Sequence, residues 1–246
     1  MVLRCANFYF IYAEIRGIAL ETVIVIAAHP DDEILGCGGA ISKHILDGDF
    51  VACVVMGTGI ASRLHEVSTN AEGIRKLRES ARNAHEILGT HDLRLLDNPD
   101  NRFDEVTLLD LVQQIEGINL KLQPTLVYTH HWSDVNVDHR IVCDAVAAAS
   151  RSVPGQSINE VRHFEVLSST NWSFSSGATQ FKPNLFVDIS KHVKEKIRAL
   201  EAYGSEMREY PHSRSLEASE ALAMFRGSTA GVARAEAFEV SRRIIR

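Results

Sequence analysis

Histidines and carboxylates gather in two short polar segments of the chain, and side chains of these types can bind a catalytic metal ion. The first segment is Ala28–Glu33 (AHPDDE) and the second is His130–His139 (HHWSDVNVDH). Two imidazoles and one carboxylate that leave a coordination position open are the set that catalytic zinc prefers. His29 and Asp32 are joined by a tight turn that contains a proline, so both side chains can face one ion. Asp31 lies beside them, in the position of a general base for a metal-bound water.

Each segment also has a simpler interpretation when it is taken alone. The tripeptide HPD after a strand is typical of a turn whose aspartate caps a helix, and three consecutive acidic residues at the start of a helix interact favourably with its dipole. The remaining single histidines favour structural or solvated roles: His44, His65, His85, His91, His163 and His192. The second polar segment, with histidines and carboxylates of its own, favours a metal site over these interpretations.

A glycine cluster, Gly36–Gly39 (GCGG), raises the alternative of a dinucleotide site. Its glycines do not follow the G-x-G-x-x-G pattern, and the aspartates before it would repel a pyrophosphate. We therefore interpret the cluster as a place where a helix packs closely on a sheet.

The elements around these segments alternate between strand and helix. Short β-branched runs predict strands over 22–28, 50–56, 93–96 and 125–129, and helical spacing predicts helices over 34–46, 71–88, 106–122 and 139–149. This alternation predicts an α/β fold, with a mostly parallel sheet, right-handed crossovers and helices on both faces. Ligands of such sheets bind beyond the carboxyl ends of the strands, which is where both polar segments fall.

The second half of the chain is less regular. We predict strands over 162–166 and 184–188, a helix over 191–203 and a loop over 168–178. No repeat or low-complexity linker divides the chain. We therefore expect a single domain over residues 1–246, with a core of about 22–240 and an N-terminal extension, 1–20, to which no residue assigns a role.

Composition narrows the class of protein. The 246 residues are 45% apolar and 24% charged, which is ordinary for a soluble globular protein and excludes disorder, collagen and coiled coil. The net charge of −6 argues against a nucleic-acid binder, which needs a basic face.

The compartment follows from the cysteines and from the lengths of the apolar runs. No apolar run approaches the roughly 20 residues that cross a bilayer, so no stable membrane insertion is expected. The N-terminus lacks a small-residue cleavage site of the kind that ends a secretory signal. The four cysteines are widely spaced and suggest neither a disulfide framework nor a zinc-cysteine site: Cys5, Cys37, Cys53 and Cys143. We expect a cytoplasmic protein.

The two polar segments also match known motifs. Ala28–Ile41 (AHPDDEILGCGGAI) resembles the first motif of the PIG-L/LmbE family of zinc-dependent N-deacetylases, and Asp134–His139 (DVNVDH) resembles the second. Further stretches extend the similarity over about residues 22–240: Arg78-Glu79, Pro99–Asp104 (PDNRFD), Arg226-Gly227 and Ala235–Phe238 (AEAF).

This resemblance implies a Rossmann-like three-layer fold and removal of acetyl groups from N-acetylglucosamine-type amines in sugars or glycoconjugates. It implies that His29, Asp32 and His139 bind Zn²⁺ and that Asp31 is the general base. Family sites accept other divalent ions too, and relatives are often oligomers, so a homo-oligomer is expected.

One position departs from the family pattern, because Asn136 stands where many members have a histidine. An amide can donate a hydrogen bond to an oxyanion, but it cannot deliver a proton. The acid must then be Asp31, after it has taken the proton of the water, or another histidine; His130 is the first candidate, followed by His131 and His212. Asp138 is expected to orient a ligand imidazole.

Candidates for substrate binding are fewer. Arg63 and Arg102 lie on loops at the expected active edge, and the segment Tyr210–Ser215, with His212, is a candidate to cover the site from the same or a neighbouring subunit. Trp132 and Trp172 are candidates to stack on a sugar ring or to pack in the core. Two other functions remain open: a zinc amidase for a larger acyl group, and a degenerate sugar-binding protein, against which the intact Asp31 argues.

Overall fold

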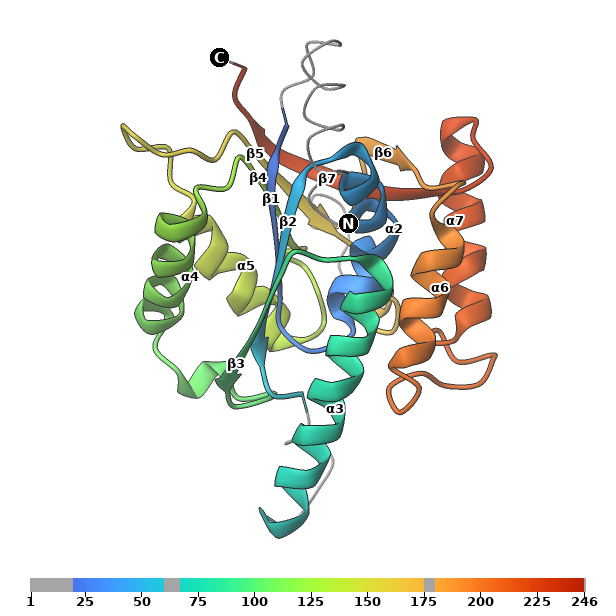
Figure 1. Cartoon of the computed structure of the whole chain (residues 1–246), viewed down its shortest axis with the longest axis horizontal. Helices are drawn as coiled ribbons and strands as arrows, with labels where there is room; N and C mark the ends of the chain where they lie inside the picture. Colours follow the sequence, from blue (N-terminus) through green and yellow to red (C-terminus); the bar gives the residue numbers. More distant parts are fainter. Residues whose placement is uncertain (1–19, 60–66, 175–179, 246) are drawn as a thin grey trace, which may run out of the picture.

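Seven strands form one sheet in the computed structural model, which describes residues 20–59, 67–174 and 180–245 (Figure 1). Their order across the sheet is β3-β2-β1-β4-β5-β7-β6. The strands are β1 (Thr22–Ala27), β2 (Phe50–Gly57), β3 (Asp92–Asn98), β4 (Leu126–His130), β5 (Glu160–Phe164), β6 (Leu185–Asp188) and β7 (Ala235–Arg243). Strands β1 to β5 pair in parallel, while β7 is antiparallel to both β5 and β6.

Helices cover both faces of this sheet. In Figure 1, α4 (Leu108–Leu122) and α5 (Val137–Ala149) lie on one side. On the other side lie α2 (Asp32–Asp47), α3 (Val67–Leu88), α6 (Val193–Ala202) and α7 (Leu216–Ala230). Short 3₁₀ helices in the described loops include η2 (Phe103–Glu105) and η3 (Thr170–Trp172). The expected three-layer α/β architecture with a mostly parallel sheet is confirmed.

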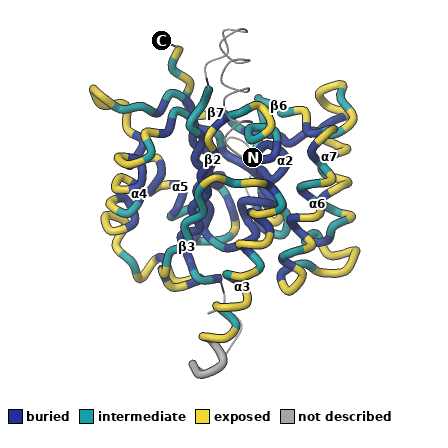
Figure 2. Tube along the Cα trace, viewed as in Figure 1, coloured by how far each residue is buried: buried dark blue, intermediate teal, exposed yellow. Residues whose placement is uncertain are grey.

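The central strand β1 is buried on both faces, which explains its uninterrupted apolar run. Val23 and Val25 pack into the core beneath α2, α3 and α6, whereas Ile24 and Ile26 pack into the core beneath α4 and α5. Each such side chain contributes about 1.5–3 kcal/mol when it is fully buried. The buried sheet and the exposed outer surfaces of the helices are visible in Figure 2.

The glycine cluster lets α2 approach the sheet closely. A Cβ added at Gly36 would lie 2.3 Å from the ring of Phe164, and one added at Gly39 would lie 2.8 Å from Ile189. The predicted use of these glycines is therefore confirmed.

The C-terminal part holds the elements that the sequence did not predict. The apolar residues of α7 do not gather on one side of the helix, so they give no clear helical period. Strand β7 contains Glu236 and Glu239 among its apolar residues and inserts between β5 and β6, against the order of the chain. None of the helices in the described ranges is both long and apolar enough to cross a membrane.

Candidate active site and metal centre

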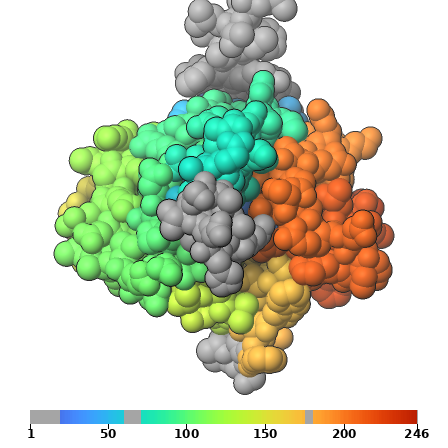
Figure 3. Space-filling view, turned by 90° about the horizontal axis from the view of Figure 1, so that it is seen from below, coloured from blue at the N-terminus to red at the C-terminus, as the bar shows by residue number. Residues whose placement is uncertain are grey.

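The two polar segments meet where β1 and β4 end. These strands are neighbours in the sheet although 98 residues lie between them, from 28 to 125, because the chain places β2 and β3 on one side of β1 and β4 on the other. Such a reversal of strand order is where ligands of open α/β sheets bind. Figure 3 looks onto this end of the molecule, where segments coloured from cyan and green to orange lie side by side.

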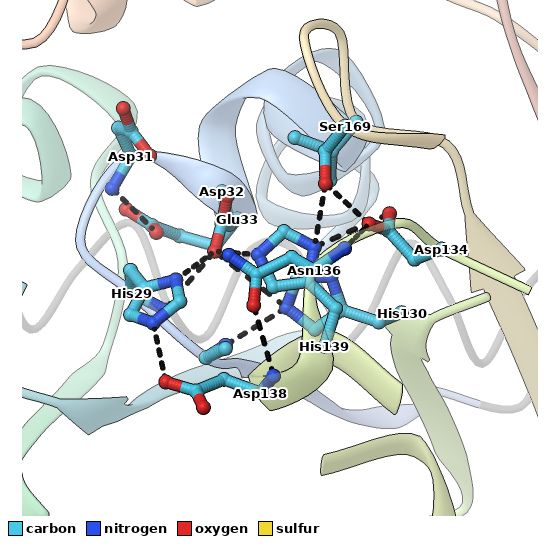
Figure 4. Close-up of polar contacts among 12 residues, drawn as sticks. His29, Asp31, Asp32, Glu33, His130, Asp134, Asn136, Asp138, His139 and Ser169 are labelled. Carbon is cyan, nitrogen blue, oxygen red and sulfur yellow. Dashed lines mark hydrogen bonds and ion pairs between the residues drawn. The ribbon is translucent and has the colours of Figure 1, made fainter. Parts of the chain in front are cut away.

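Three side chains from these segments converge on one point. The Oδ2 atom of Asp32 lies 3.3 Å from Nδ1 of His29 and 3.1 Å from Nε2 of His139. All three ligand atoms lie within 4.8 Å of one another, and the two rings are 5.3 Å apart between centroids (Figure 4). The structure thus brings together the three residues that the family resemblance proposes as ligands.

The second nitrogen of each imidazole is held by a carboxylate. Nε2 of His29 lies 2.9 Å from Oδ2 of Asp138 and 3.1 Å from Oδ1 of Asp100. Nδ1 of His139 lies 3.2 Å from Oδ2 of Asp134. Carboxylates in this position orient metal-binding histidines and raise their basicity.

Local structure fixes these carboxylates in turn. Asp134 accepts hydrogen bonds from the hydroxyls of Ser169 and of Thr170, the latter at 2.6 Å. Asp138 accepts the backbone N–H groups of Asn101 at 2.6 Å and of Phe103 at 3.1 Å. Neither carboxylate can turn toward a metal ion without breaking these hydrogen bonds.

The charges of the cluster favour a cation. Burial alone would lower the pKa of His29, but hydrogen bonds to Asp138 and Asp32 outweigh it and raise the pKa to about 10. Burial would also lower the pKa of His139, but Asp32 and Asp134 outweigh it and raise this pKa to about 9. Burial would raise the pKa of Asp32, yet the neighbouring imidazoles hold it well below its usual value. The buried carboxylates thus stabilise positive charge at this point.

Two other groups of three could also hold an ion by distance alone: His130 with Asp134 and His139, and His29 with Asp100 and Asp138. Both depend on the carboxylates that Ser169, Thr170 and the backbone of residues 101 and 103 already bind. His130 is fully buried, its ring stacks on that of His139 at 3.9 Å, and its Nε2 accepts the N–H of Ala28 at 2.8 Å. Asp32 accepts a backbone N–H as well, that of His29 at 3.0 Å, but its Oδ2 atom also lies between two imidazoles; on this basis the cluster of His29, Asp32 and His139 is the strongest candidate of the three for a metal site.

Asp31 lies beside this cluster in an unusual backbone conformation. It is the N-cap residue of α2 with φ 106° and ψ −29°, a region that side-chain-bearing residues rarely adopt. Strain of this kind costs on the order of 1–3 kcal/mol and collects at functional sites. Its side chain is buried, and Oδ2 accepts a hydrogen bond from Nη1 of Arg214 at 3.1 Å. Burial raises the pKa of Asp31 well above its usual value, although Arg214 opposes this rise.

A polar cavity of about 150 Å³ opens onto the cluster. It is lined by His29, Pro30, Asp31, Asp32, Gly59, Asp100, Asn101, Asn136, Glu206 and Arg214. The proposed base and two of the three proposed ligands therefore face a common space.

The residues proposed to complete the chemistry lie at different distances from this cavity. Asn136 lines it: its Oδ1 caps α5 by accepting the N–H of Asp138 at 2.8 Å, and its Nδ2 points toward Asn101. His130 and His131 do not line it. His131 is buried, with its Nε2 3.3 Å from Glu239, and burial lowers the pKa of both imidazoles. His212 is exposed and packs against Trp172, with ring centroids 5.6 Å apart.

The structure does not bring Arg102, one of the two predicted substrate-binding arginines, into the cavity. Arg102 is 63% exposed and pairs with Glu105 at 3.7 Å on the surface. Arg63 lies outside the described residues. The ring of Trp132 packs at a tilt against that of His131, with centroids 4.0 Å apart, whereas Trp172 is about half exposed.

Sequence reasoning missed several residues near the site, among them Arg214, Asp134 and Glu206. Arg214 lies in the segment proposed to cover the site, yet its neighbour His212 seemed the better candidate. Asp134 opens the second motif, and Glu206 lies in a stretch without a motif. Of these residues, Asp134 alone could have been found from the sequence pattern. A carboxylate five residues before a proposed ligand histidine can turn back to it across the start of a helix.

Comparison with known proteins finds one matching family model and relatives that are named deacetylases. The model of the GlcNAc-PI de-N-acetylase family, PIG-L, matches residues 24–150. An uncharacterized deacetylase of Escherichia coli, YaiS, is 34% identical over 137 residues, which is 54% of this chain and 69% of that protein. The diacetylchitobiose deacetylase of Thermococcus kodakarensis is 30% identical over 203 residues, covering 77% of this chain and 72% of the relative.

A solved structure shares the fold. The N,N'-diacetylchitobiose deacetylase of Pyrococcus horikoshii, complexed with an inhibitor, superposes with a TM-score of 0.71 at 22% identity. The match covers 96% of this chain and 92% of that one.

Proposed function

Because this chain belongs to the GlcNAc-PI de-N-acetylase family, we propose that it is a metal-dependent hydrolase. The proposed reaction removes the N-acetyl group from an N-acetylglucosamine-type sugar or glycoconjugate. One observation carries the proposal: the convergence of His29, Asp32 and His139 beside a cavity that Asp31 lines. A sugar-binding protein would need the cavity, but it would have no use for a strained carboxylate beside a cation site.

The donor set fits Zn²⁺. His29 would bind through Nδ1, His139 through Nε2 and Asp32 through Oδ2, because these atoms face one another and the remaining ring nitrogens are held by Asp138 and Asp134. Two imidazoles and one carboxylate with a position left open are typical of catalytic zinc. Other divalent ions with a similar preference for nitrogen and oxygen would also fit.

When bound, Zn²⁺ would lower the pKa of a coordinated water toward about 7 and polarise the acetamide carbonyl. The chain supplies the other functions. Asp31 faces the cavity and accepts the proton of the attacking water, while Arg214 fixes the orientation of its carboxylate. The side-chain amide of Asn136 donates a hydrogen bond to the developing oxyanion, a contribution that this kind of donor makes in other hydrolases.

The leaving amine also needs a proton, and we assign its delivery to Asp31. The proton that Asp31 takes from the water returns to the amide nitrogen as the C–N bond breaks, which gives acetic acid and a free amine. At neutral pH the acid then ionises to acetate and the amine takes up a proton. His130, His131 and His212 are less suited: the first two are buried away from the cavity, and the third packs on Trp172.

The cavity supports a small polar group as the part of the substrate that enters. Its lining is almost entirely polar and carries four carboxylates against one arginine, which already pairs with Asp31. Sugar hydroxyls can donate hydrogen bonds to such carboxylates, and the named relatives from Thermococcus and Pyrococcus are deacetylases of a neutral disaccharide. A larger acyl group would have to fit the same 150 Å³.

A substrate panel tests the proposal. The purified protein, loaded with Zn²⁺, is incubated with N-acetylglucosamine, N,N'-diacetylchitobiose, and nucleotide-linked and lipid-linked N-acetylglucosamine, and both acetate and free amine are measured. We expect equimolar acetate and amine from at least one substrate and no product after treatment with a chelator. Binding of these sugars without any product would instead indicate a degenerate binding protein, and cleavage only of longer N-acyl groups would indicate an amidase.

A further inference from the structure

Asp31 has a second contact that lies outside the cavity. Its backbone N–H donates a hydrogen bond to Oε2 of Glu33 at 3.1 Å, and both residues are buried. Glu33 does not line the cavity, so it does not contact a substrate there directly, whereas its contact with Asp31 links it to a residue that does line the cavity. The contact spans two residues at the first turn of α2, at the point where the backbone has φ 106°.

The other oxygen of Glu33 is anchored to two helices that are distant in sequence. Oε1 accepts the hydroxyl hydrogen of Tyr203 at 2.7 Å, at the end of α6, and lies 3.2 Å from Nε2 of His85 on α3. Nδ1 of His85 lies 2.9 Å from the hydroxyl of Thr90. This pattern is satisfied when His85 donates from Nε2 and accepts at Nδ1. Burial and the nearby charge of Glu33 raise the pKa of Tyr203 well above its usual value, so its hydroxyl remains a donor.

We propose that Glu33 is a positioning residue that holds Asp31 in its left-handed backbone conformation, and so keeps the carboxylate of the general base directed at the metal centre. The proposal rests on the proposed function for the role of Asp31. A favourable interaction with the helix dipole explains an acidic residue at this position, but it leaves unexplained why the side chain of Glu33 turns inward to Tyr203 and His85. An unstrained alternative conformation of Asp31 would swing its side chain away from the cavity, and small displacements of a catalytic group cost large factors in rate.

Two variants and one control separate positioning from general stability. Glu33→Gln replaces one acceptor oxygen by an NH₂ group and leaves the size of the side chain unchanged. Tyr203→Phe removes a single hydroxyl that contacts Glu33 and carries the test if Glu33→Gln does not fold. Ile41→Val is the control, because Ile41 is a core residue of the same helix, 1% exposed, and outside the site.

The first readout needs no substrate. Exchange of the Asp31 amide hydrogen is followed by NMR in the zinc-loaded proteins. We expect exchange at least about tenfold faster in Glu33→Gln, and a smaller increase in Tyr203→Phe, because the amide loses its protecting acceptor or that acceptor loses its anchor. Ile41→Val is expected to leave it unchanged. The exchange measurement tests the role of Glu33 even if none of the tested sugars is a substrate of the wild-type protein. A failure of the proposed function would therefore be recognised separately.

The second readout is turnover. We expect kcat of Glu33→Gln to fall by about 10- to 100-fold, with KM and bound zinc within about twofold of wild type, whereas Ile41→Val keeps its kcat despite a lower thermal midpoint. Unchanged exchange of the Asp31 amide in Glu33→Gln and Tyr203→Phe would overturn the proposal. So would faster exchange with unchanged kcat, since Glu33 would then stabilise the helix start without positioning the base.

Discussion

At the scale of the residue, the site contains side chains that we propose to bind the metal ion and other side chains that hold these in place. Asp32 is the shared partner of the two imidazoles that we propose as ligands, and Asp134 and Asp138 contact the far sides of those rings. Asp31 lies next to Asp32 in the chain, yet it faces Arg214 and the cavity instead of the two rings. Adjacent carboxylates therefore have different tasks, because one backbone conformation turns their side chains in different directions.

The first prediction concerns Asp31→Asn. The amide is nearly isosteric but cannot accept a proton, so we expect kcat to fall by about 10²–10⁴-fold, the usual contribution of a general base. Bound metal, measured by elemental analysis, is expected to match that of wild type, because Asp31 is not among the three converging donors. Activity equal to that of wild type would remove Asp31 from the mechanism.

A second prediction concerns Asp134→Asn. Loss of the carboxylate beside Nδ1 of His139 is expected to weaken zinc affinity by about 10- to 100-fold, as measured by competition with a fluorescent chelator. Asp144→Asn is a suitable control, since Asp144 is an exposed residue of the same helix as His139. Equal zinc affinity in both variants would show that Asp134 has no part in orienting His139.

At the scale of the element, the sequence predicted most of what places the site. Buried strands such as β1 and β4 appear as β-branched runs, and the polar residues that interrupt them mark the carboxyl edge of the sheet. The sequence could not place β7, because its pairing with β5 and β6 depends on contacts far apart in the chain. For the same reason the sequence did not indicate that Arg214 and Glu206 line the cavity, since they reach it only through the fold of the segment after α6.

The close packing of α2 on the sheet gives a prediction about stability. In Gly36→Ala the new methyl group would meet the ring of Phe164, so we expect a loss of about 1–3 kcal/mol in the free energy of unfolding, measured with urea. Gly117→Ala is the matched control: Gly117 lies in α4 with no heavy atom within 4 Å of an added Cβ, and we expect a gain of about 0.4–1 kcal/mol. Equal effects of the two substitutions would contradict the tight contact at Gly36.

At the scale of the whole molecule, the proposed metal centre would join parts of the fold that are otherwise separate. His29 lies just before α2, Asp32 is the first residue of α2, and His139 belongs to α5. Helices α2 and α5 lie on opposite faces of the sheet (Figure 1). An ion bound by all three would therefore link the two outer layers across the end of the sheet. Removing it would take a positive charge away from a cluster of buried carboxylates.

Removal of the metal should accordingly lower thermal stability. An ion present at about 1,000 times its Kd stabilises a folded protein by about 4 kcal/mol, which for a chain of this size corresponds to a shift in Tm of roughly 8–16 °C. We expect such a decrease after dialysis against a chelator, and recovery when Zn²⁺ is returned, as followed by differential scanning calorimetry. Asp32→Asn, which lacks the shared ligand charge, should show little response to either step.

The most direct test is anomalous diffraction at the zinc absorption edge from crystals of the zinc-loaded protein. We expect one strong peak with Nδ1 of His29, Nε2 of His139 and a carboxylate oxygen of Asp32 at about 2.0–2.2 Å, and with Asp31 near it but outside bonding distance. A peak between His130, Asp134 and His139, or between His29, Asp100 and Asp138, would contradict the proposed centre, as would the absence of any peak among these residues.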